Sequence, residues 1–214
     1  MLFGLFFDIW SFLILMTIIH FGCWIEFVRI MKRISGKRYM LYSLLGIFYI
    51  SLPIWAMLVL GIGDGIYFLS PLNKWTYDPI LPCSIIFSIW INDTMAYIVG
   101  SLIGKTPFSK ISPKKTWEGT AGGAVLCVGV IALLGSVIPE AKELPLKIWI
   151  TIAALSAVFG TLGDLLESKL KRAANVKDSG TIMPGHGGFL DRFDSMLVAT
   201  PAVFLYLLLI IHNP

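Results

Sequence analysis

Acidic side chains near the C-terminus have the types and the spacing to bind a cation. Asp164 is followed three and four residues later by Glu167 and Ser168, so a continuing helix would place all three on one face. Asp191 and Asp194 are likewise three apart, at the start of the last apolar run. Carboxylates at the mouth of a membrane helix are costly unless they are paired or bound to a cation. Oxygen ligands of this kind suit Mg²⁺, which usually shares its coordination shell with water and substrate phosphates.

Helix capping is the alternative interpretation of Asp191 and Asp194, because either carboxylate alone could complement the dipole at the start of the last helix. The presence of Asp164 and of a glycine-rich turn just before these aspartates favours a cation site. Asp93, together with Asn92, interrupts a different apolar run. We expect it to face the protein interior or a water-filled cavity, and a hydrogen bond between helices is an equally good interpretation.

Several basic residues accompany the acids and could neutralise phosphate oxygens with point charges or forked donors. They are Lys114, Lys115, Lys171, Arg172 and Lys177. Each of them taken singly is also expected as a solvated loop charge, and Lys171 could pair with Glu167, four residues before it. Their proximity to acids and glycines in the sequence favours phosphate binding.

The stretch "PGHGG", Pro184 to Gly188, adds a candidate anion cradle. Its glycines, Gly185, Gly187 and Gly188, allow the backbone to approach a ligand closely. His186 between them could donate to a phosphate or assist proton transfer. Backbone N–H groups in such a turn, followed by a helix N-terminus, attract anions.

Composition then indicates which elements must position these residues. Of the 214 residues, 57% are hydrophobic and 14% charged, and the mean hydropathy is +0.81. Apolar runs near the length of about 20 residues that crosses a bilayer recur along the chain. We therefore predict an all-α integral membrane protein, a single polytopic domain over 1–214, with about six transmembrane helices. They lie within residues 1–28, 39–62, 80–103, 119–138, 147–166 and 195–212.

Basic residues predict the orientation of these helices, because short loops rich in lysine and arginine stay in the cytoplasm. Segments 29–38, 104–118 and 167–194 hold 14 of the 17 lysines and arginines. The prediction places both termini outside and the polar segments at the cytoplasmic face. A short chain of this pattern is typical of bacteria, so the expected location is a bacterial inner membrane. The net charge of +4 belongs to that face, and no nucleic acid is expected as a partner.

Two segments together resemble a known family, the CDP-diacylglycerol synthases, also called phosphatidate cytidylyltransferases. One segment contains Ser168, Lys171-Arg172, Lys177-Asp178 and "PGHGGFLDRFD", at the spacing of the family signature. The other contains "SPKKTWEG", Ser112 to Gly119, the companion motif. The resemblance covers roughly residues 90–212, the catalytic region. The chain departs from the family pattern in its short N-terminal part and at Met95, Ser101 and Met183.

The resemblance implies that CTP and phosphatidate react to give CDP-diacylglycerol and pyrophosphate, with Mg²⁺ required. It implies Asp164 and Asp191 as the leading metal ligands, with Asp194 as a third ligand or a neighbour of the ligands. The implied catalytic residues are Lys171, Arg172, Lys177, Asp178, His186 and Asp194. The implied substrate-binding residues are Ser112, Lys114, Lys115, Thr116, Glu118, Ser168, Gly185, Gly187, Gly188 and Arg192.

Other functions remain open at this point. A CTP-dependent polyprenol kinase would also unite CTP, Mg²⁺ and a membrane lipid, but it would release CDP instead of pyrophosphate. A transporter could use Asp93 and Asp164 as ion ligands within the membrane, although no internal repeat supports that function. A non-catalytic scaffold is a third interpretation. A homodimer is among the expected assemblies.

Overall fold

The chain folds into helices, as predicted. The computed structural model describes residues 2–62, 77–109, 111–181 and 187–212. Two isolated β-bridges lie within these ranges, Ile62 with Tyr77 and Pro107 with Thr116. The α-helices are α1 (Leu2–Phe6), α2 (Ile9–Ser35), α3 (Tyr39–Ser43), α4 (Leu52–Gly61), α5 (Ile80–Ile103), α6 (Trp117–Val137), α7 (Leu146–Ala173) and α8 (Leu190–His212).

Five helical stretches among the described residues are long and apolar enough to cross a membrane. They are the α2–α3 stretch Ile9–Ser43, α5, α6, α7, and Leu190–Ile210 of α8. The span predicted over 39–62 corresponds instead to α3 and a shorter apolar helix, Ile47–Gly61. The protein is therefore an all-α membrane protein with about the predicted number of apolar helices, one of them shorter than a full span.

Two of the predicted membrane spans, those within 1–28 and 39–62, are interrupted by residues that start a new helix. Asp8 separates α1 from α2: its carboxylate accepts from the backbone N–H of Ser11 at 2.7 Å, and the Ser11 hydroxyl accepts from the backbone N–H of Asp8 at 3.1 Å. This reciprocal pair is a capping box, which starts a new helix. In the second run a π-helical turn, Ile47–Ser51, precedes Pro53 near the start of α4. Proline has no N–H for an α-helical bond to the preceding turn, which favours a break here.

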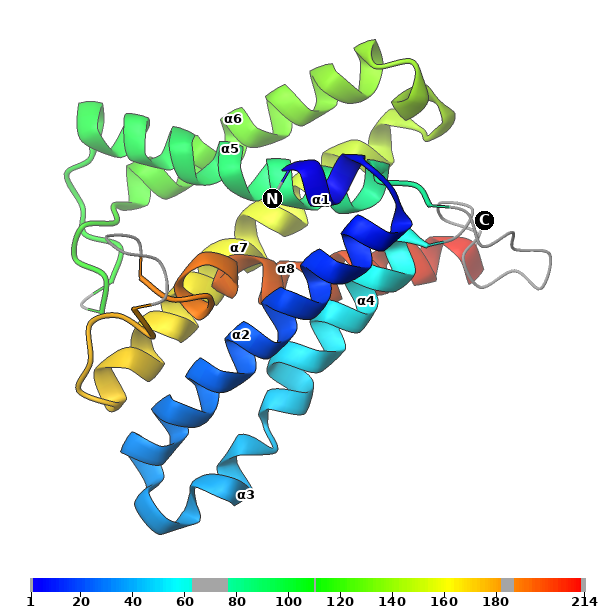
Figure 1. Cartoon of the computed structure of the whole chain (residues 1–214). Coiled ribbons are helices and arrows are strands. Elements are labelled where there is room, and N and C mark those ends of the chain that lie inside the picture. The colour runs from blue at the N-terminus through cyan, green and yellow to red at the C-terminus, as the bar shows by residue number, and fades with distance from the viewer. Residues whose placement is uncertain (1, 63–76, 110, 182–186, 213–214) are drawn as a thin grey trace.

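Helix α8 lies in the middle of the bundle and contacts α7, α4, α5 and α2. Figure 1 shows the antiparallel α5–α6 pair on one side of α8, and α2 with α4 on the other. Buried apolar residues of α8, among them Leu197, Val203 and Leu207, belong to the hydrophobic core. The start of α8, with Asp191 and Asp194, is therefore held between elements from both halves of the chain.

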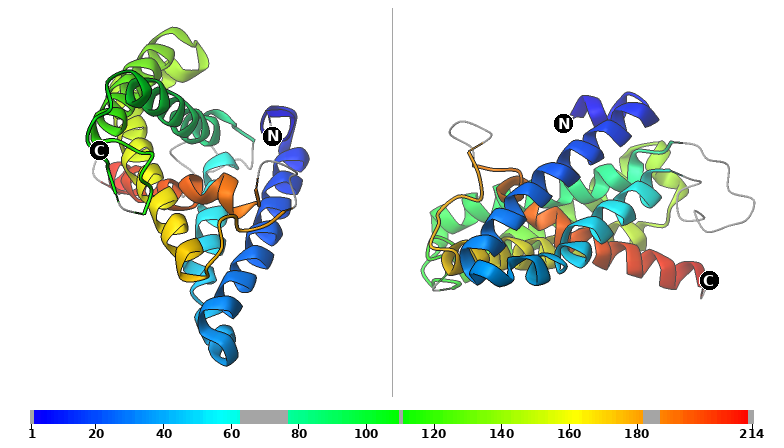
Figure 2. Two further views of the ribbon diagram at one scale, coloured as in Figure 1. Left: turned by 90° about the vertical axis from the view of Figure 1, so that its left-hand side faces the viewer. Right: turned by 60° about the horizontal axis from the view of Figure 1, so that its bottom comes forward.

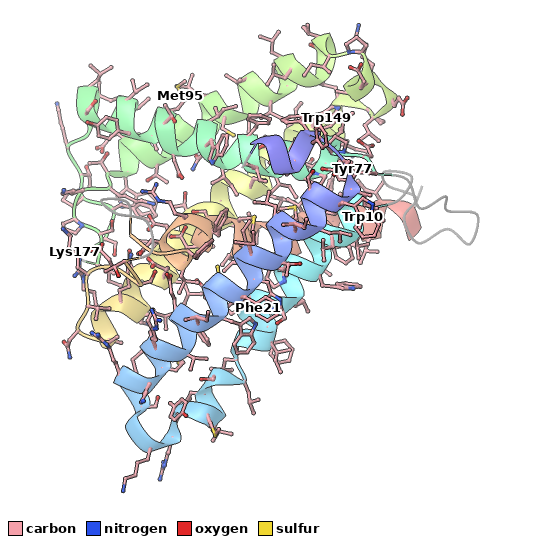
Figure 3. The ribbon with its side chains drawn as sticks, in the orientation of Figure 1. Trp10, Phe21, Tyr77, Met95, Trp149 and Lys177 are labelled. Atoms are coloured by element: carbon pink, nitrogen blue, oxygen red, sulfur yellow. The ribbon has the colours of Figure 1, made fainter. Side chains whose placement is uncertain are left out.

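The three basic segments lie toward one end of the bundle. The loop between α5 and α6 and the connection from α7 to α8 lie near each other there, and the turn after α2 lies toward the same end but apart from them, whereas the connection between α6 and α7 lies at the other end (Figures 1 and 2). Lys177, in the connection from α7 to α8, marks the basic end in Figure 3. This arrangement agrees with the charge pattern of the sequence.

Candidate functional site

A polar cavity of about 570 Å³ joins the two motif segments. We call it the acidic cavity; α5, the loop before α6, α7 and the start of α8 line it. The residues predicted from sequence that line it are Ser112, Lys114, Lys115, Thr116, Asp164, Asp191 and Asp194. Asp93 lines it as well, which confirms that this residue faces a cavity. Residues as far apart as 93 and 194 thus share one site.

Close packing of α7 against α8 brings their acids together. A Cβ atom at Gly163 would lie 2.5 Å from the backbone oxygen of Asp194 and 3.0 Å from Cα of Ser195. The first of these distances is shorter than real Cβ contacts, so only glycine allows this separation of the two helices. Asp164, the next residue, is consequently held against the first turns of α8.

Three carboxylates form the part of the site best suited to a cation. Oxygens of Asp164, Glu167 and Asp194 all lie within 4.8 Å of one another. Glu167 is fully buried and Asp194 is 7% exposed, whereas Asp164 is ion-paired with Lys115 and lies 3.5 Å from the Ser168 hydroxyl. An all-oxygen, anionic donor set fits a hard divalent cation such as Mg²⁺. Glu167 belongs to this group although the sequence prediction did not name it as a ligand.

Asp191 is engaged in a different set of interactions. One carboxylate oxygen lies 2.6 Å from Nζ of Lys171, which also pairs with Glu167 at 2.5 Å. The other oxygen accepts from the backbone N–H and the hydroxyl of Ser179 and from the backbone N–H of Gly188, each at 2.8 Å. Asp191 therefore fastens the connection from α7 onto the start of α8. Its assignment as a metal ligand stays a prediction. The ion pair between Lys171 and Glu167, which was the alternative to phosphate binding by Lys171, is present.

Glu26 of α2 is a site residue that the sequence analysis missed. It is fully buried, and its carboxylate accepts from the backbone N–H groups of Phe189 and Leu190 at 3.0 and 2.9 Å. The carboxylate also lies 2.6 Å from the Ser179 hydroxyl, whose single proton it shares with Asp191. A Cβ at Gly188 would overlap this carboxylate. A distant helix thus supplies the anionic cap for α8. The signal was available, since an acid inside an apolar membrane run marks a functional position.

The loop before α6 is organised by two other predicted residues. Glu118 accepts from the backbone N–H of Lys105 at 3.2 Å, and from the backbone N–H and the hydroxyl of Thr106 at 3.1 and 2.8 Å. The Thr116 hydroxyl accepts from the backbone N–H of Gly119 at 3.1 Å and caps α6. Glu118 therefore holds the loop closed and does not line the acidic cavity.

The remaining predicted residues lie around this centre. Lys177 and Asp178 line a separate cavity of about 370 Å³ together with Arg29 and Arg33 of α2. Arg172 is exposed. Gly187 has a φ of +80°, which favours glycine. Gly185 and His186 lie outside the described residues, so their predicted roles stay predictions.

Comparisons with known proteins agree with these motifs. Residues 39–210 match the model of the cytidylyltransferase family. Phosphatidate cytidylyltransferase of Bacillus subtilis is 48% identical over 126 residues, which are 58% of this chain and 45% of the relative. That of Synechocystis is 40% identical over 193 residues, covering 79% of this chain and 62% of the relative. The chloroplastic phosphatidate cytidylyltransferase 4 of Arabidopsis thaliana is 40% identical over 123 residues, 58% of this chain and 31% of the relative. The chain spans less than two thirds of the length of each of these three relatives.

Proposed function

The chain belongs to the cytidylyltransferase family, and on that premise we propose that it transfers the cytidylyl group of CTP to phosphatidate. The products are CDP-diacylglycerol and pyrophosphate. The observation that carries the proposal is the acidic cavity, in which the Ser112–Thr116 loop faces the acids of α7 and α8. Cations and hydroxyls on one wall and carboxylates on the other are the groups that a metal-bound triphosphate needs.

The reaction asks mainly for alignment and charge neutralisation. An oxygen of the lipid phosphate attacks the α-phosphorus of CTP, a new P–O bond forms, and the bond to the β-phosphate breaks as pyrophosphate leaves. The attacking oxygen is already anionic, so little base assistance is needed. Catalysis of this kind depends on positioning and on electrostatic stabilisation. Lys114 and Lys115 would bind the triphosphate, with Ser112 and Thr116 as hydroxyl donors.

The carboxylates divide into two roles in this proposal. Asp164 and Asp194, with Glu167 beside them, would hold Mg²⁺. Bound Mg²⁺ would act as a Lewis acid that withdraws negative charge from the phosphates. Asp191, with Lys171, would position the start of α8, in addition to its predicted role as a ligand. Arg172, Lys177 and His186 keep their predicted roles toward the phosphates, and Asp178 keeps its prediction as a catalytic residue.

The two substrates also explain the placement of the site. Phosphatidate keeps its acyl chains in the membrane while CTP arrives from the cytosol, so we place the acidic cavity at the cytoplasmic face of a bacterial inner membrane. The gathering of the basic segments at one end of the helices supports this orientation. The homodimer expected from the sequence stays a prediction.

The test is to incubate the purified full chain in detergent with CTP, phosphatidate and Mg²⁺, and to follow pyrophosphate together with the lipid product. We expect pyrophosphate and CDP-diacylglycerol in equal amounts, and neither after the metal is chelated. Release of CDP with a polyprenol acceptor would contradict the proposal and support a lipid kinase. Absence of turnover with both acceptors would favour the scaffold or the transporter.

A further inference from the structure

A second polar cavity lies beside the last turns of α2. It encloses about 370 Å³ between Arg29 and Arg33 of α2 and residues 176–181 of the connection from α7 to α8, and we call it the basic cavity. Among the described residues, none lines both this cavity and the acidic cavity. Arg29, Arg33, Lys177 and Thr181 are exposed. The basic cavity is therefore open to a ligand from outside the helix bundle.

The charges around the basic cavity are unbalanced. Arg29, Arg33 and Lys177 line it with three positive charges, and Asp178 adds one negative charge. No acid in the described part of the chain lies within ion-pair distance of any of the three cations. Arginine side chains are planar forks whose N–H groups match the oxygens of a phosphate. The basic cavity therefore has the charge and the donors to bind a phosphate group.

A stripe of exposed apolar side chains on α2 leads up to Arg29. It consists of Ile14, Ile18, Phe21 and Ile25, which are 60, 52, 61 and 48% exposed, and we call it the α2 stripe. Its members follow one another at three or four residues, and Arg29 follows Ile25 at four, so they share one face of the helix. The stripe rises about 16 Å along the helix axis, roughly half of the thickness of a hydrocarbon core. It therefore has the length of the acyl chains in one leaflet of a membrane.

The cavity and the stripe together indicate a lipid as the ligand. The phosphate group is common to lipid headgroups and to soluble phosphates, and the charges of the basic cavity suit both. A soluble phosphate has no use for an apolar surface that ends at those charges, whereas a phospholipid requires one. Basic pockets beside membrane helices bind the headgroups of anionic lipids. The α2 stripe therefore favours an anionic phospholipid over a soluble phosphate.

We propose that the basic cavity binds the phosphate of an anionic phospholipid whose acyl chains lie along the α2 stripe. Arg29 and Arg33 hold the phosphate oxygens from α2, and Lys177 faces them from the connection from α7 to α8. The bound lipid is a resident ligand and is not consumed in the reaction. The inference therefore goes beyond the proposed function and does not depend on it.

A lipid in the basic cavity would stabilise the start of α8. Ser179 lines the cavity, and its backbone N–H donates to Asp191 at 2.8 Å. Glu26, on α2 three residues before Arg29, accepts from the backbone N–H of Leu190 at 2.9 Å. A phosphate that bridges α2 and the connection from α7 to α8 would thus hold together two elements that both fasten α8. Because a ligand of the folded state raises its stability, binding should be visible as a higher melting temperature.

The test follows thermal unfolding of the purified full chain in detergent while a phospholipid is titrated. Phosphatidylglycerol is the probe, because its headgroup is anionic and it is not a substrate of the proposed reaction. We expect it to raise the melting temperature to a plateau, and phosphatidylcholine with the same acyl chains, which has no net charge, to leave it unchanged. Arg29→Gln/Arg33→Gln should need roughly tenfold more phosphatidylglycerol for the same rise, since each cation near the headgroup contributes to binding.

Controls separate a local site from the general charge of this end of the molecule. Lys37→Gln/Arg38→Gln removes the same charge from two exposed residues that follow α2 and lie outside the lining of the basic cavity, and it should respond to phosphatidylglycerol as wild type does. Arg29→Lys/Arg33→Lys keeps the charges and should retain most of the response, which also makes it the variant to use if the glutamine variant does not fold. Inorganic phosphate at the same concentrations should give no rise, because it has no chain to lie on the α2 stripe.

Three outcomes would overturn the inference. An equal rise with phosphatidylcholine would show that the headgroup charge is not recognised. An unchanged response in Arg29→Gln/Arg33→Gln would show that these arginines only orient the helices in the membrane. An equal rise with inorganic phosphate would make the basic cavity a site for soluble anions. None of these measurements uses turnover, so the lipid site and the proposed function stand or fall separately.

Discussion

Asp164 is the acid at which the interactions of the two motif segments converge. It pairs with Lys115 of one segment and lies in the carboxylate group of the other. We predict that Asp164→Asn lowers kcat roughly 100- to 1000-fold, the loss typical of removing one electrostatic stabiliser. The kcat is measured as the rate at which the purified protein releases pyrophosphate from CTP. Glu143→Gln, at an exposed acid in the connection between α6 and α7, is the matched control and should retain full activity.

Retention of activity in Asp164→Asn would remove this residue from the metal site. A loss of activity accompanied by aggregation would show only that the protein had not folded. The variant should therefore be compared with wild type by size-exclusion chromatography before its kinetics are measured.

Glu26 carries a second prediction at the scale of single residues. Glu26→Ala leaves the backbone N–H groups of Phe189 and Leu190 without their acceptor, and an unpaired buried donor costs about 1–3 kcal/mol. We expect a lower melting temperature and a loss of activity, since the start of α8 carries Asp191 and Asp194. Thr17→Ala, at an exposed hydroxyl on the same helix, should change neither. Wild-type melting and turnover in Glu26→Ala would show that α8 does not need this cap.

These two residues illustrate what sequence can reveal about the site. Asp164 was predictable, because the acids and their motif lie in one short segment. Glu26 is separated from Ser179 by 153 positions, and no local pattern indicates which buried acid meets which helix start. Lys177 was expected beside the phosphates, and the structure places it in a cavity with Arg29 and Arg33. Such pairings depend on how helices pack, which local sequence patterns do not determine.

At the scale of helices, the site depends on the separation of α7 and α8. Gly163→Ala places a methyl group 2.5 Å from the backbone oxygen of Asp194, and a backbone atom cannot rotate away as a side chain can. We predict that the helices move apart and that activity falls by up to roughly 100-fold, as for small displacements of catalytic groups. Gly129→Ala, in the apolar helix α6, has no atom within 4 Å of its new methyl group and should be silent. Equal activity of the two variants would contradict the importance of this crossing.

The helices themselves were largely predictable, since long apolar runs have few alternatives in a bilayer. The two interruptions were missed for different reasons. Asp8 and Ser11 form a recognisable capping box, but hydropathy averaged over a span hides a single acid. Pro53 is followed by further apolar residues of α4. The hydropathy of the run is therefore continuous, although its α-helical hydrogen bonding is interrupted.

At the scale of the whole molecule, a site shared by both motif loops requires them to lie on the same side of the membrane. We predict that cysteines introduced as Lys105→Cys and Thr181→Cys react with an impermeant thiol reagent only from the cytoplasmic side. Lys142→Cys, between α6 and α7, should react only from the opposite side. The native Cys23, Cys83 and Cys127 are buried, so background labelling should be low. Labelling of positions 105 and 181 from opposite sides would exclude a shared site.

The fate of the phosphorus atoms of CTP distinguishes cytidylyl transfer from phosphoryl transfer. The purified protein is given phosphatidate, Mg²⁺ and CTP labelled at either the α- or the γ-phosphate, and the lipid extract is counted. Cytidylyl transfer predicts that the α-label enters the lipid in proportion to turnover, while the γ-label stays in water-soluble pyrophosphate. Appearance of the γ-label in the lipid would contradict the account, because it would mean that the acidic cavity transfers the terminal phosphoryl group instead.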